Sequence, residues 1–283
     1  MSPSTTNGSE PSVRISKGQA FPRPPSFKDP HEERQYVKQR LALAFRIFAK
    51  QGFDEGVAGH ITVRDPVDPA TFWVNPFGVA WPLLRASDLI RVNHEGEVVD
   101  GGPVRLLNVA APDNMTVAYM IHSAVHEARP DVNAVAHSHS IYGRAFATLG
   151  RPLDIITQDA CAFYNDIAHY DSFGGIVLGP EEGQRIVEAL GQKKAAILAN
   201  HGLLTCGQSV ESCVFWFNSL EKCCHAQLLA DAAAAGRGGE TVKVTEEEAA
   251  FTYKTIGNEV AGWFSAKPAF DMMEYESGSE YKM

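Results

Sequence analysis

The sequence lacks both a long apolar run and a basic cluster. No stretch approaches the roughly 20 apolar residues of a membrane span, and the first ten residues, Met1–Glu10, are polar, without the apolar centre of a secretory signal. The chain carries 25 Lys and Arg against 34 Asp and Glu, which gives a net charge of −9. These absences disfavour a membrane or a nucleic acid as the principal partner.

A disulfide framework is also missing. The five cysteines are odd in number and have no framework spacing: Cys161, Cys206, Cys213, Cys223 and Cys224. Free thiols suit a reducing compartment, so we expect a cytoplasmic protein. The neighbours Cys223 and Cys224 fall in a predicted helix, where packing as small hydrophobes is favoured over a redox or soft-metal role.

The composition predicts one principal domain with tails. Hydrophobic residues make up 45% of the 283 residues, which is enough for a sizeable core. Residues 1–30 are rich in Pro and Ser, so we expect a flexible arm there. Residues 31–240 should form the domain, and 241–283 a C-terminal helix and tail, because Thr245 and Glu248 have the spacing of a capping box.

Apolar spacing predicts a mixture of helices and strands. Val37, Leu41, Phe45 and Phe48 recur at helical spacing, and Gly52 ends the pattern. Other runs predict strands at 61–64, 71–75, 89–93 and 98–99, and helices at 116–128, 181–190 and 209–235. This order of elements predicts an α/β (α+β) sandwich.

Two histidines close another apolar run. In Val132–His139, His137 and His139 are two residues apart, so both imidazoles should project from one face of a strand. A second buried strand at 194–200 would deliver His201 to the same place. Three neutral imidazoles leave a coordination position open, as a catalytic metal requires. We therefore expect a metal site at His137, His139 and His201.

The segments around these histidines resemble the signature of the class II aldolase and adducin family. The resemblance is carried by Arg129–Ser140 and Asn200–Leu203, and it runs from about residue 31 to residue 236. It implies a class II aldolase-like sandwich with a mostly antiparallel central sheet flanked by helices. It also implies that the three histidines bind a divalent metal ion, commonly zinc, and that the chain forms homo-oligomers, often tetramers, with active sites at subunit borders.

Two departures from the sugar-phosphate aldolases bear on the reaction. The Ser-Ser-Glu segment of those enzymes, which holds the catalytic carboxylate four residues before a helical His, corresponds here to Thr116-Val117-Ala118 before His122. An aldolase Tyr corresponds to Gln158. Because both proton-transfer groups are replaced, the resemblance does not imply a plain sugar-phosphate aldolase.

Other residues are candidates for proton transfer or substrate orientation. Tyr164 has a phenol that could donate a proton, Gln158 and the adjacent Asp159 could orient a ligand or water, and His169 could act as an acid or base. The alternative for each is a structural role, because buried polar side chains commonly satisfy backbone groups.

His122 and His126 are four residues apart on a predicted helix, so they share a face. A metal pair at this spacing is chemically allowed. We favour instead a place away from the site for His122 and a surface position for His126.

The sequence favours a metal-dependent carbon–carbon lyase, either retro-aldol or decarboxylating, that acts next to a carbonyl of a small oxygenated substrate. Iron(II) in the same site would instead indicate a non-heme iron oxygenase on a keto or enol substrate. Gly59–Arg64 and Asn75–Gly78 resemble the adducins, which leaves an adducin-like actin-cytoskeleton binding protein as a third hypothesis. The retained metal histidines argue against this third role.

Overall fold

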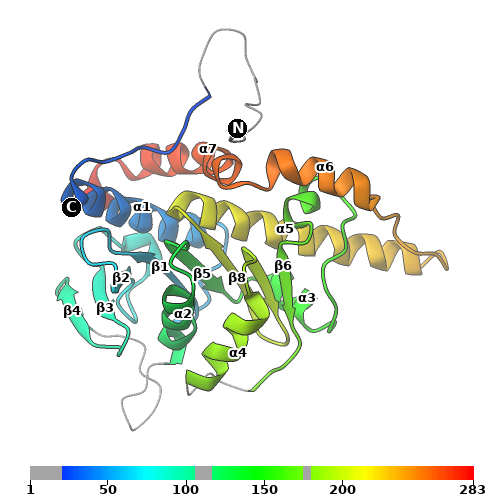
Figure 1. Ribbon diagram of the computed structural model, residues 1–283, viewed down its shortest axis with the longest axis horizontal. Helices are drawn as coiled ribbons and strands as arrows, with labels where there is room; N and C mark the ends of the chain where they lie inside the picture. Colours follow the sequence, from blue (N-terminus) through cyan, green and yellow to red (C-terminus); the bar gives the residue numbers. More distant parts are fainter. Residues whose placement is uncertain (1–20, 106–116, 175–179) are drawn as a thin grey trace, which may run out of the picture.

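A single sheet runs through the middle of the molecule in the computed structural model, which describes residues 21–105, 117–174 and 180–283 (Figure 1). Within these residues the sheet has eight strands in the order β4-β3-β2-β1-β5-β8-β7-β6. Every neighbouring pair is antiparallel except β6 and β7, which are parallel. The predicted mostly antiparallel sheet is therefore confirmed. The strands are β1 (His60–Arg64), β2 (Thr71–Val74), β3 (Ile90–Asn93), β4 (Val98–Gly101), β5 (Ala134–Ser138), β6 (Ile167–Tyr170), β7 (Ala195–Leu198) and β8 (Gly202–Gly207).

Long helices cover one face of the sheet. α1 (Pro30–Lys50) and α5 (Val210–Ala235) lie on the sheet, and α7 (Glu259–Ser277) packs on both of them. The predicted first helix is confirmed, and it begins where the Asp29 side chain accepts a hydrogen bond from the His31 N–H. α3 (Ile141–Ala147) and α6 (Glu246–Ile256) complete this layer, together with the 3₁₀ turns η1 (Trp81–Leu83), η2 (Asp159–Phe163) and η3 (Glu280–Lys282).

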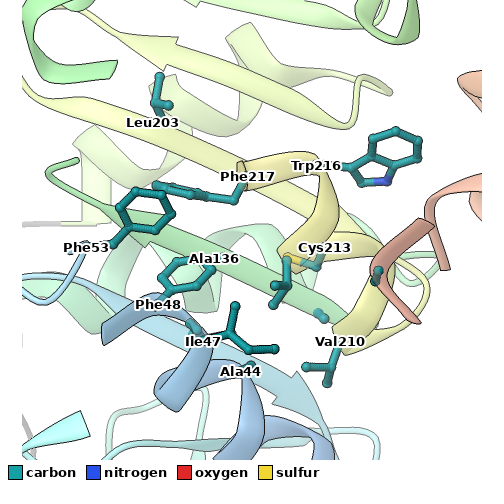
Figure 2. Packing of buried hydrophobic residues seen from close by; sticks show 14 of the residues in the cluster. Ala44, Ile47, Phe48, Phe53, Ala136, Leu203, Val210, Cys213, Trp216 and Phe217 are labelled. Atoms are coloured by element: carbon teal, nitrogen blue, oxygen red, sulfur yellow. The ribbon is translucent and has the colours of Figure 1, made fainter. Parts of the chain in front are cut away.

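Aromatic side chains fill the core between these helices and the sheet. Figure 2 shows three phenylalanines gathered over Ala136 of β5: Phe48 of α1, Phe53 of the loop after α1, and Phe217 of α5. Ring centroids of the three phenylalanines lie 4.8 to 5.3 Å apart. Aromatic pairs at this separation add stability beyond the area that they bury. This cluster is the larger of the two main cores and fixes α1 and α5 against the sheet.

Two helices cover the opposite face. α2 (Val117–Ala128) and α4 (Pro180–Leu190) pack on each other, α2 also against β1 and β5, and α4 against β6 (Figure 1). Val125 and Ile186 join Val135, Leu198 and Leu204 in a separate core on this side. Because strand residues alternate between faces, the neighbours of Val135, namely Ala134 and Ala136, belong to the core under α1 and α5. The sheet thus separates two cores.

The described segment before α1 packs on the helical layer. The ring of Phe21 lies 4.6 Å from that of Phe264, and Phe27 lies 5.1 Å from Tyr36. Residues 1–20, most of the predicted arm, are outside the described residues. The capping box of Thr245 and Glu248 is confirmed at the start of α6, and a second helix, α7, follows. No helix of the described part is long and apolar enough to cross a membrane.

Candidate metal centre

Three histidines meet at one end of the central strands. His137 is in β5, His139 follows the end of that strand, and His201 is in the turn between β7 and β8. β5 pairs with β8 along its whole length, with His137 opposite Leu204. This pairing brings the end of β5 to the start of β8, so residues 64 positions apart in the sequence become neighbours. The fold therefore brings together the three histidines predicted from the sequence.

The Asn200-His201-Gly202 turn has a backbone that few other residues could adopt. Asn200 has a φ of 56°, in the left-handed region that asparagine tolerates better than most residues. A Cβ on Gly202 would lie 2.7 Å from the carbonyl oxygen of Ser138, closer than real contacts allow. The glycine therefore lets the turn approach the end of β5 and brings His201 next to His137.

The geometry of the three side chains suits one ion. One ligand nitrogen from each of His137, His139 and His201 lies within 4.8 Å of the other two. The ring centroids are 4.7 to 5.2 Å apart. The Nδ1–H of His137 donates to the carbonyl oxygen of Leu203 at 2.9 Å, because a carbonyl can only accept. This bond fixes the tautomer and leaves the Nε2 lone pair of His137 free for a metal.

Burial keeps the three imidazoles neutral. Burial, together with His201 and His139, holds the pKa of His137 well below its usual range. Burial lowers the pKa of His201 to about 4, and burial and Arg144 lower the pKa of His139 against the opposing effect of Glu55. Neutral imidazole is the form that binds metals. Among the described residues, this is the group of His, Cys, Asp and Glu side chains that could hold an ion, and its donors fit zinc or iron.

Residues around the cluster were not singled out from the sequence. Arg144 of α3 pairs with Glu55 at 2.8 Å, and both act on His139. The ring of Phe173, which is 54% exposed, lies 6.5 Å from that of His201. No spacing in the sequence points to these residues, because they reach the cluster from separate loops and a helix. Together they form a mixed charged and aromatic border around His139 and His201.

The other predicted site residues are not brought to the cluster within one chain. Gln158 is the exposed N-cap of η2 and Tyr164 is its half-buried C-cap. η2 packs on α5 and α6, on the far side of the sheet from α2 and α4. Ala168 and Tyr170 of β6 belong to the core under α2 and α4. Because side chains alternate along a strand, His169 projects from the opposite face of the sheet, on the side of α5. Its Nε2 is buried without a hydrogen bond to a described residue.

The expectation that His126 lies at the surface is wrong, and His122 does lie near the cluster. Both are 1% exposed, because the face of α2 that carries them packs on β1 around Thr62. His60 of β1 is also buried beside the cluster and was not named as a candidate from the sequence. Of the segment that replaces the aldolase Ser-Ser-Glu, Thr116 is outside the described residues.

The chain belongs to the family of the Class II Aldolase and Adducin N-terminal domain, whose model matches residues 39–228. The resemblance inferred from the histidine segments is thereby confirmed. The eight-stranded sheet and its flanking helices are the class II aldolase fold.

Similar proteins are named after different reactions. Decarboxylase NovR of Streptomyces niveus is 43% identical over 250 residues, which cover 88% of this chain and 87% of NovR. The 4-hydroxy-3-prenylphenylpyruvate oxygenase/4-hydroxy-3-prenylbenzoate synthase of Streptomyces roseochromogenus subsp. oscitans is 43% identical over 250 residues, 88% of this chain and 85% of the relative. The solved structure of L-fuculose 1-phosphate aldolase from Glaciozyma antarctica PI12 has a TM-score of 0.82 at 50% identity, over 92% of this chain and 97% of that one. The family and these names suggest a lyase-type enzyme.

Proposed function

We propose that the protein is a divalent-metal-dependent carbon–carbon lyase acting next to a carbonyl of a small oxygenated substrate. The observation that carries the proposal is the set of neutral imidazoles of His137, His139 and His201, whose ligand atoms lie within 4.8 Å of one another. Because this group contains no carboxylate, its ligands leave the charge of a divalent ion uncompensated. Such a site supports retro-aldol or decarboxylating chemistry, in which negative charge develops on substrate oxygen atoms.

The metal ion and the protein chain would have separate roles in this reaction. A bound divalent ion supplies Lewis acidity that stabilises negative charge on a carbonyl oxygen. The chain supplies orientation: the carbonyl of Leu203 holds the His137 ring, and the Asn200-His201-Gly202 turn holds His201. Zinc is the proposed ion, and iron(II) is the alternative that imidazole ligands also suit.

Proton transfer needs a group other than the aldolase carboxylate. Tyr164, Gln158 and His169 lie across the sheet from the cluster of their own chain. We therefore propose that any of them with a chemical role reaches the cluster of a neighbouring subunit. This requires a homo-oligomer, for which a tetramer is the proposed state. The carbonyl substrate would then bind at a subunit border.

A non-heme iron oxygenase acting on a keto or enol substrate is the second candidate. It is favoured by the relative named 4-hydroxy-3-prenylphenylpyruvate oxygenase, which is 43% identical. The donor set speaks against it, because the commonest iron oxygenase triad has two histidines and one carboxylate. An adducin-like actin-binding protein is the third candidate, and the intact histidine cluster disfavours it.

The first test is the metal content of protein purified anaerobically, without a histidine tag or added metal, measured by plasma mass spectrometry. Near-stoichiometric zinc supports the lyase, and iron puts the oxygenase ahead. If the protein contains no metal, the lyase and the oxygenase are both contradicted, and the adducin-like actin-binding role remains. The test variant is His137→Ala, which should lose the metal with little loss of fold. The control variant is His31→Ala, which changes an exposed histidine of α1 and should keep the metal. Retained stoichiometric metal in His137→Ala would refute the site assignment.

The second test separates the reactions. The metal-loaded protein is offered L-fuculose 1-phosphate and 4-hydroxy-3-prenylphenylpyruvate, with and without dioxygen, and products are identified by mass spectrometry. Carbon–carbon cleavage without dioxygen supports the lyase. Product formation that strictly requires dioxygen would refute the lyase and support the oxygenase.

A further inference from the structure

A second set of histidines adjoins the metal centre on the side of the sheet covered by α2. His60 of β1 pairs with His137 of β5, and residues opposite each other in antiparallel strands project from the same face. The ring centroid of His122 lies 6.0 Å from that of His60. His126 lies one helical turn after His122. We call His60, His122 and His126 the inner histidine group; all three are at most 4% exposed.

Thr62 links two members of this group through one hydroxyl. Its Oγ1 lies 2.9 Å from Nδ1 of His122 and 2.8 Å from Nε2 of His126. A hydroxyl has a single proton, so both contacts are satisfied when it donates to one ring and accepts from the other. The tautomer of His122 is therefore coupled to that of His126. Thr62 determines whether the other nitrogen of His122, Nε2, carries a proton or a lone pair.

Three nitrogen atoms of the group lack a partner. Nδ1 of His60, Nε2 of His122 and Nδ1 of His126 are buried and form no hydrogen bond with a described residue. Buried polar atoms are usually paired, so the unpaired atoms of His60 and His122, the two residues nearer the candidate active site, point to a ligand.

Two arginines lie close to these histidines, and both are engaged. Arg64 donates to four backbone carbonyls, those of Pro69, His126, Arg129 and Val132. Arg144, beside His139, pairs with Glu55. Recognition of a phosphate needs cations or several N–H donors aimed at its oxygens. The guanidinium of Arg64 is committed to these carbonyls, and that of Arg144 is paired with a carboxylate.

Building on the proposed function, we propose that His60 and His122 bind a hydroxyl group of the substrate, and that the site selects uncharged oxygen substituents over phosphate. A hydroxyl both donates and accepts, so it satisfies Nε2 of His122 in either tautomer. A phosphate ester near neutral pH mainly accepts, and its charge would be buried with few hydrogen-bond donors to compensate it. Neutral histidines serve as hydrogen-bonding groups in other active sites.

The test uses two hydroxamates on the zinc-loaded protein, measured by titration calorimetry. Acetohydroxamate and glycolohydroxamate both chelate a metal, and the second adds a hydroxyl. Wild type should bind glycolohydroxamate about tenfold more tightly, which is the effect of one hydrogen bond to a buried group. The Thr62 hydroxyl also holds the His122 ring in its orientation, so Thr62→Val should abolish this preference and leave acetohydroxamate binding and zinc content unchanged. Thr62→Ser, which keeps the hydroxyl, should retain the preference.

The outcomes separate this inference from the proposed function. If neither hydroxamate binds wild type, the metal-lyase proposal fails and this one with it. If both bind with equal affinity, or if Thr62→Val keeps the preference, the role of the inner histidine group is refuted while the metal site stands. Tighter binding of O-phosphorylated glycolohydroxamate than of glycolohydroxamate would also refute it.

A measurement on wild type keeps the test independent of any variant's folding. In protein labelled with ¹⁵N-histidine, ring nitrogen shifts report the tautomer of each imidazole. Glycolohydroxamate should move the Nε2 resonance of His122, and acetohydroxamate should leave it in place. Identical spectra with the two ligands would refute the proposed contact.

Discussion

The carboxylate of Glu221 holds the chain segment that follows His139, and we predict that Glu221→Gln lowers the free energy of unfolding by about 2–3 kcal/mol. Glu221 is in α5 and is 5% exposed. It accepts hydrogen bonds from Ser140 Oγ at 2.5 Å, from Tyr142 N at 2.8 Å and from Gly143 N at 2.6 Å. Ser140 is the N-cap of α3, but its own side chain caps no backbone N–H. The Glu221 carboxylate therefore caps the N-terminus of α3 in place of the Ser140 side chain.

The predicted loss in the free energy of unfolding follows from the number of hydrogen bonds that Glu221 accepts. A hydrogen bond to a charged acceptor contributes about 1.5–3 kcal/mol, and a buried donor left without a partner costs about 1–3 kcal/mol. The amide of Gln keeps one acceptor oxygen and turns an NH₂ toward a donor, so at least one N–H of α3 loses its bond. Loss of the negative charge at the helix N-terminus adds to the effect. The segment from His139 to α3 should loosen, and metal affinity should fall.

The assay is urea unfolding of metal-free protein, in which the midpoint shifts at constant slope. The control is Glu276→Gln, whose carboxylate is 41% exposed and pairs with Lys50. This change should cost less than about 1 kcal/mol, because exposed ion pairs contribute little. If Glu221→Gln is no more destabilising than the control, Glu221 does not hold α3 and the reasoning is wrong.

Other predictions concern protons, metal and subunits. Burial lowers the pKa of His60 and His201 to about 4 from 6.5, so between these pH values the unfolded chain binds protons that the folded chain excludes. Acidification through this range should destabilise the metal-free protein, by on the order of 3 kcal/mol for His60 alone; a flat urea midpoint against pH would contradict this. Saturating zinc should raise the melting temperature of wild type in calorimetry and leave that of His137→Ala unchanged, because a ligand in hundredfold excess over its Kd stabilises by about 2.7 kcal/mol; an equal rise in both proteins would contradict the site. Tyr164→Phe should lower turnover with metal content intact, and mixing its subunits with those of His137→Ala should restore turnover; unchanged turnover would remove Tyr164 from the mechanism.

Elements with strong local patterns could be predicted from the sequence. The apolar spacing from Val37 to Phe48 predicted α1, and Thr245 with Glu248 predicted the start of α6. α3, β6, β8 and the separate helix α7 were not predicted. α3 is capped by Glu221, 81 residues from Ser140 in the sequence, so its start has no local signal. β6 has four residues, and the six residues of β8 are all buried and do not alternate.

The candidate metal ligands could be predicted because each follows from a short-range rule. His137 and His139 share a strand face, and His201 ends the next buried run. The inner histidine group has no such rule, because it depends on the register that sets His60 opposite His137. The burial of His126 likewise depends on Thr62 from another element. A helix pattern alone does not show which polar residue will meet a polar partner.

The two faces of the sheet decide which groups can act together. His137 shares a face with Val135 and the α2 core, whereas His169 and η2 belong to the α5 side. Side chains alternate along a strand, so no small motion carries a residue from one face to the other. A proton donor for the cluster must therefore come from the α2 side of the same chain, from the segment that holds Glu55 beside His139, or from a second chain. Next to His137, the imidazoles of His60 and His122 orient oxygen atoms better than they supply protons. The subunit-mixing experiment is decisive for this reason: it asks whether a second chain provides the acid.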